Sequence, residues 1–155
     1  MSEPATSEPA ASEPAASEPA EPKTDSTRSG PGRLLVAIYG LFALSASARA
    51  GVQIATKFHH APVAYVLSAF AGAVYILATA TLSVGSPRAR RIALVSCSIE
   101  LAGVLAVGTW SMVDPASFPD ATVWSGYGYG YGYVPLVLPV FGLLWLRYWS
   151  AKTRA

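Results

Sequence analysis

Four stretches of the chain are almost entirely apolar, and each is long enough to form a helix that crosses a bilayer. They run from about residue 34 to 56, 62 to 84, 92 to 113 and 133 to 149. A helix needs about 20 mostly apolar residues to cross the hydrocarbon core. A helix of a soluble bundle would carry polar residues along one face, and these stretches carry almost none. The pattern therefore predicts an all-α fold, a four-helix transmembrane bundle.

The N-terminal region has a different composition and is predicted to be a disordered acidic tail with a linker. Residues 2–21 repeat a five-residue unit, SEPAT-SEPAA-SEPAA-SEPAE. Proline in every unit prevents a continuous helix, and too little apolar surface is present to offset the entropy of ordering. The predicted organisation is a tail over 1–32, a membrane domain over 33–150 and a C-terminus over 151–155. The tail is either a docking segment or a plain spacer.

Composition supports a membrane protein and gives no sign of an enzyme. Of the 155 residues, 52% are hydrophobic and only 13% are charged, against roughly 25% charged in soluble domains. No basic cluster with interleaved aromatics is present, which argues against nucleic acid as a partner. The single cysteine, Cys97, excludes an intramolecular disulfide and predicts a small buried residue. Paired carboxylates, Ser-His-Asp spacing and HExxH are absent, so we predict no catalytic activity and no cofactor.

Basic residues are concentrated in the segments that four spans would place on one side of the membrane. Nine lie on that side, and only Lys57 lies on the other. The positive-inside rule then places both termini in the cytoplasm of a multi-pass cell-membrane protein. An alternative is a signal peptide cleaved after the sequence Ala46-Ser47-Ala48, which would leave three spans. The nine residues are Lys23, Arg28, Arg33, Arg88, Arg90, Arg91, Arg147, Lys152 and Arg154.

Arg49 and Glu100 are the only charged residues well inside the predicted spans. Charges at such depth are costly and usually face a partner or a wet cavity. By helix rise, Arg49 lies roughly 22 Å and Glu100 roughly 12 Å from the cytoplasmic edge. Gln53 shares a helix face with Arg49, and Tyr75 comes at about the depth of Glu100. These four residues are the candidate site, with Arg49 and Glu100 as a direct or water-bridged pair.

The segment between the third and fourth spans is rich in aromatic residues and glycine. Residues 114–132 read DPASFPDATVWSGYGYGYG. Trp124 and the tyrosines suit a membrane–water interface, so we expect a loop on the outer face that caps the Arg49 side. No pore helix of the K⁺-channel type is evident. His59 and His60 are adjacent and poorly spaced to bind one metal ion, so an interfacial pair of side chains is favoured over a metal site.

The run FPDATVWSGYGYGYGYVPLVLPVFGLLWLR, residues 118–147, resembles the C-terminal part of an uncharacterised family. Its members are small four-span integral membrane proteins of high-GC Gram-positive bacteria. RLLVAIYGLFAL at residues 33–44 and the arginines at 88–91 are similar too. The resemblance covers residues 33 to about 149 and implies a four-span membrane domain. It implies no activity, because no catalytic residues are assigned to the family.

Two functions of different classes are consistent with these observations. The first is a structural or accessory subunit of a membrane complex, whose partners are the lipid bilayer and another membrane protein or a second copy. The second is a carrier of small solutes or protons that uses Arg49 and Glu100. Four-span transporters with one embedded Glu are known, typically as dimers, but their Glu lies in the first span.

Overall fold

The computed structural model describes residues 30–152, which form four long helices joined by short turns and one longer loop. The long helices are α1 (Pro31–Lys57), α2 (Pro62–Val84), α3 (Pro87–Val113) and α4 (Val134–Lys152). The loop contains two short 3₁₀ helices, η2 (Pro115–Ser117) and η3 (Ser125–Tyr131). All four long helices are long and apolar enough to cross a membrane, which confirms the predicted fold class. Residues 1–29 of the tail predicted over 1–32 lie outside the described residues, whereas Pro31 and Gly32, predicted as linker, already belong to α1 because proline is favoured in the first helical turn.

The ends of the helices follow local chemistry that is visible in the sequence. Proline stands in the first turn of α1, α2 and α3, where its missing N–H costs nothing. Gly85, with φ of 70°, ends α2 in the left-handed conformation. The Ser86 side chain accepts a hydrogen bond from the Ala89 amide (3.1 Å) and caps α3. Because of this cap, α3 begins at Pro87 rather than near residue 92, and Arg88 to Arg91 are helical rather than a connecting loop.

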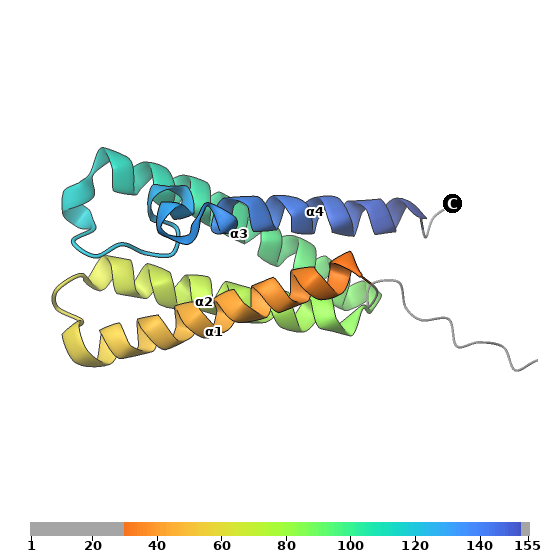
Figure 1. Ribbon diagram of the computed structural model, residues 1–155, viewed down its shortest axis with the longest axis horizontal. Coiled ribbons are helices and arrows are strands. Elements are labelled where there is room, and N and C mark those ends of the chain that lie inside the picture. The colour runs from red at the N-terminus through yellow and green to blue at the C-terminus, as the bar shows by residue number, and fades with distance from the viewer. Residues whose placement is uncertain (1–29, 153–155) are drawn as a thin grey trace, which may run out of the picture.

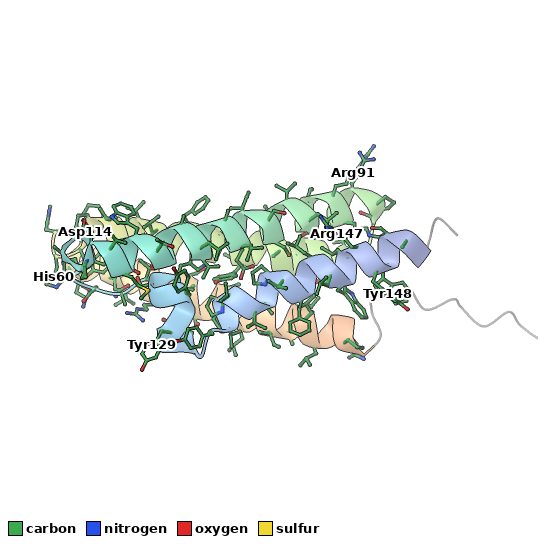
Figure 2. The ribbon with its side chains drawn as sticks, turned by 90° about the horizontal axis from the view of Figure 1, so that it is seen from above. His60, Arg91, Asp114, Tyr129, Arg147 and Tyr148 are labelled. Carbon is green, nitrogen blue, oxygen red and sulfur yellow. The ribbon has the colours of Figure 1, made fainter. Side chains whose placement is uncertain are left out.

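The helices run alternately up and down, so the start of α1 and the end of α4 lie at the same end of the bundle (Figure 1). Figure 2 shows Arg91 and Arg147 at that end and His60 and Asp114 at the opposite end. We refer to the latter as the outer end, following the charge pattern. Small residues let α1 and α2 approach closely: a Cβ at Gly72 would lie 3.2 Å from the Ser47 backbone nitrogen.

At the outer end of the bundle, the place beside α3 that a longer α4 would occupy is taken by the loop that contains η3. Figure 1 shows α4 beginning well short of the outer end that α3 reaches, with η3 lying between them. η3 packs against α3 and α4. Inside η3, Gly126, Tyr127 and Gly128 have positive φ, and a Cβ at Gly128 would lie 2.8 Å from Pro135. Glycine at position 128 therefore allows the loop to turn tightly into the start of α4.

Candidate functional site

Glu100 lies at the centre of the bundle, midway along α3, with 0% of its surface exposed. Neither of its carboxyl oxygens makes a hydrogen bond of normal geometry within the described residues. The hydroxyls of Tyr39 and Tyr75 are near enough to interact with the carboxyl, and each also has a second partner. The Tyr39 hydroxyl pairs with Cys97 Sγ (3.3 Å), and the Tyr75 hydroxyl accepts a hydrogen bond from Trp124 Nε1 (3.1 Å). Since Tyr75 accepts from Trp124, its own O–H remains available to the Glu100 carboxyl, which is lined by two hydroxyls without a hydrogen bond of normal geometry.

Each long helix contributes to the walls around Glu100. Tyr39 comes from α1, Tyr75 from α2 and Cys97 from the turn of α3 that precedes Glu100. From α4, Gly142 allows close approach, since a Cβ there would lie 2.9 Å from Cys97 Sγ and 3.4 Å from the Tyr39 hydroxyl. Bulky groups on three helices and a glycine on the fourth therefore enclose the carboxyl tightly.

Trp124 forms the outer wall above Glu100, and its indole is 1% exposed. The ring lies in a notch at Gly103, where a Cβ would come within 2.6 Å of a ring carbon. Phe70 packs against it edge to face, with ring centroids 6.1 Å apart. Gly103 is about 15 Å below the outer end of α3 by helix rise. The prediction that Trp124 lies at the membrane–water interface is therefore wrong, because the loop enters the bundle.

Hydroxyl groups fix the backbone that carries Trp124. Thr122 Oγ1 accepts hydrogen bonds from the amides of Trp124 (3.0 Å) and Ser125 (2.9 Å). Ser111 Oγ on α3 accepts one from the Gly126 amide (2.9 Å). Side-chain acceptors thus replace the helical partners that these amides lack. The hydrogen bond from Gly126 to Ser111 thus attaches the loop that covers Glu100 to α3.

The structure does not bring Arg49 and Glu100 together, so the predicted direct pair is not formed. Arg49 Nη1 donates a hydrogen bond to the Tyr131 hydroxyl (2.7 Å), and Nη2 donates one to the Ala121 carbonyl (3.3 Å). Both acceptors belong to the outer loop. The physical reason is depth, because Arg49 is two turns from the outer end of α1 whereas Glu100 is at mid-span. The expectation that the loop caps the Arg49 side agrees with these bonds.

The other two predicted site residues are buried but lie at different places. Tyr75 lies beside Glu100, as its depth predicted. Gln53 is buried in α1, and its Oε1 makes no hydrogen bond within the described residues. Gln53 lies one turn beyond Arg49 towards the outer end of α1, whereas Glu100 is at the middle of α3, so the candidate site divides into an inner group around Glu100 and an outer group around Arg49.

Asp120 ties the outer loop to the turn between α1 and α2. It accepts a hydrogen bond from the Tyr65 hydroxyl (2.5 Å), pairs with Lys57 Nζ (3.3 Å) and lies 4.0 Å from His60 Nε2. The hydrogen bond from Tyr65, reinforced by Lys57 and His60, holds the pKa of Asp120 below its ordinary value. At neutral pH the carboxylate therefore stabilises the loop that covers Glu100. Within residues 30–152, no group of three or more His, Cys, Asp or Glu side chains could hold a metal ion.

Three residues of the inner group were not predicted as site residues: Tyr39, Cys97 and Trp124. Cys97 is buried as predicted, but its pairing with Tyr39 depends on how α1 packs against α3. The hydroxyl of Tyr39 is a polar group in an otherwise apolar part of its span, and that was the available signal. For Trp124 the sequence offered no signal that separates a buried indole from an interfacial one.

Comparison of the chain with models of protein families, with curated proteins and with solved structures gave no match. The resemblance to small four-span proteins of high-GC Gram-positive bacteria stays a prediction. The function is therefore inferred from the geometry around Glu100 and Arg49.

Proposed function

We propose that this multi-pass membrane protein is a small proton-coupled carrier of the cell membrane, in which Glu100 binds and releases the proton. Both termini are cytoplasmic in this proposal, because most basic residues flank the end of the bundle where α1 begins and α4 ends. The covering loop around Trp124 faces outwards.

One observation carries the proposal: Glu100 is fully buried at mid-span, and within residues 30–152 it has no ion pair and no hydrogen bond of normal geometry, only the nearby hydroxyls of Tyr39 and Tyr75. A charge at the centre of a spanning helix costs about 2.5–3.5 kcal/mol on insertion scales. A carboxyl that only filled space would be replaced at no loss by an apolar side chain. The ion pair that would have given Glu100 a structural role is absent. A neutral acid that gives up its proton when the site opens explains why a carboxyl stands there.

The surrounding residues are suited to the two steps that such a carrier needs. In the closed arrangement Trp124 separates Glu100 from the outer side, and the neutral acid is the form that this dry site accommodates. Outward movement of the loop would admit water and allow the proton to leave. The positive-φ residues of η3 provide the backbone freedom for that movement. The hydroxyls of Tyr39 and Tyr75 stand ready to bond to the carboxylate once it forms.

A pH jump applied to proteoliposomes on a solid-supported membrane tests the proposal without a known substrate. We expect a transient current from the wild-type protein, because a proton that reaches mid-span moves through part of the membrane field. Glu100→Gln removes the titrating group and should abolish the current. Glu100→Asp keeps a shorter carboxyl and should retain a reduced current. Equal currents from wild type and Glu100→Gln would refute the proposal.

An accessory subunit is the second candidate, and an apolar groove between α1 and α4 favours it. The groove has a volume of about 490 Å³ and would accept a few apolar side chains from a transmembrane helix of a partner protein. Under this alternative Glu100→Gln leaves the pH-jump record unchanged. The lining consists of Pro31, Leu34, Leu35, Ile38, Gly132, Val134, Val137, Leu138, Phe141 and Trp145.

A further inference from the structure

A cavity separate from the apolar groove opens at the outer end of the bundle, on the other side of the loop from Glu100. Its volume is about 500 Å³, within the range of small-molecule sites. Arg49 and Tyr131 supply the polar groups at one side. Met112 and Phe118 supply apolar surface at another. A cation beside an apolar wall is the arrangement that recognises an amphiphilic anion.

The charge of Arg49 is not balanced by a carboxylate. The ion pairs formed within residues 30–152 join Asp120 to Lys57 and His60, and none involves Arg49. Arg49 donates to two neutral oxygens, whereas a guanidinium carries five N–H donors. The Tyr131 hydroxyl accepts from Arg49 and still has its own hydrogen to donate. Arg49 and Tyr131 therefore both line the cavity as donors, and no carboxylate within residues 30–152 pairs with Arg49.

The depth of Arg49 makes this lack of a counter-ion expensive. Arg49 lies about 12 Å below the outer end of α1 by helix rise. An unpaired Arg within a spanning helix is costly, and such residues usually mark a ligand or ion pathway. A bound anion would offset the cost through bidentate, charge-assisted hydrogen bonds.

We infer that this outer cavity binds an amphiphilic anion, with its phosphate or carboxylate on Arg49 and Tyr131 and its apolar part against Met112 and Phe118. The same chemistry is offered by the headgroup of an anionic phospholipid and by a small aromatic phosphate or carboxylate from solution. The anion site rests on different residues from the proton site, and neither requires the other.

The test uses the full-length protein in phosphatidylcholine nanodiscs and follows the thermal unfolding midpoint. One arm adds phenyl phosphate from solution, and the other replaces part of the lipid with phosphatidylglycerol. We expect at least one probe to raise the midpoint of the wild-type protein. The arm that responds identifies the source of the anion.

Arg49→Gln should lower the affinity for the probe that responds at least about tenfold, because the charged partner of the anion is lost. Arg91→Gln removes the same charge at the opposite end and should bind as wild type does. Glu100→Gln should also bind normally, which separates this inference from the proton-coupled function. Tyr131→Phe removes one donor and should weaken binding less than Arg49→Gln does. If Arg49→Gln fails to fold, Tyr131→Phe serves as the test variant in its place. Equal binding by wild type and the Arg49 and Tyr131 variants, or no response to either probe, would overturn the inference.

Discussion

Replacing Glu100 by methionine is expected to raise the free energy of unfolding by about 1–3 kcal/mol. The gain arises because a buried polar group without a hydrogen-bond partner costs that much relative to an apolar side chain of similar shape. Glu100 is such a group, since its oxygens are buried and make no hydrogen bond of normal geometry within the described residues. The measurement is the free energy of reversible unfolding, or the thermal unfolding midpoint, of the purified protein in mild detergent. The same variant should lose the pH-jump current, so stability and function change in opposite directions.

Val104→Met is the matched control, because Val104 is equally buried one turn further along α3. The incoming side chain is the same, but here it overpacks an apolar site and should cost about 1–3 kcal/mol. Loss of stability in both variants would mean that the Glu100 carboxyl makes a favourable interaction in the closed bundle. The predicted ion pair implied that replacing Glu100 would destabilise the protein, because Arg49 would be left uncompensated. The structure leads to the opposite expectation.

Replacing Trp124 by alanine is expected to lower the free energy of unfolding by about 3–5 kcal/mol, the usual cost of deleting a buried aromatic side chain. The indole packs on Gly103 and Phe70, and its Nε1 donates to the Tyr75 hydroxyl. Its loss leaves a cavity directly above Glu100. Trp110→Ala is the control, because Trp110 is a half-exposed indole on the surface of α3 and should cost much less.

A second substitution isolates the contact between the indole and the notch at Gly103. In the wild-type background Gly103→Leu should be severely destabilising, because even a Cβ would lie 2.6 Å from the ring. In the Trp124→Ala background the leucine enters the vacated space and should recover part of the loss. The four proteins form a double-mutant cycle, and residues in contact give interaction energies of about 0.5–3 kcal/mol. Simple additivity would show that the loop does not hold its indole in the bundle.

The four helices were predictable because the properties that determine them are local. The bounds of α2 match the predicted 62–84, since Pro62 and Gly85 mark its ends in the sequence. The start of α3 was placed too late, because the charged residues Arg88 to Arg91 obscured a helix that Ser86 and Pro87 begin. Hydropathy locates the apolar part of a span, whereas caps determine where the helix itself begins.

The candidate site was predictable only in part, because its contacts join segments distant in the chain. Glu100 and Arg49 were found since charges in apolar runs are anomalous. The predicted direct pair between them does not form, because the outer loop supplies Arg49 with a backbone carbonyl and a tyrosine hydroxyl. The position of Trp124 depends on the notch at Gly103, about three turns from the outer end of α3, and no periodicity in the sequence signals that fit.

The central claim, that Glu100 is a buried acid which takes up and releases a proton, is tested most directly by infrared difference spectroscopy. Wild-type protein and Glu100→Gln are recorded in liposomes across a pH titration. We predict a carbonyl band of a protonated carboxylic acid in the wild-type protein that Glu100→Gln lacks and that disappears when the proton is released. Identical carboxyl spectra for the two proteins at every pH would contradict the claim.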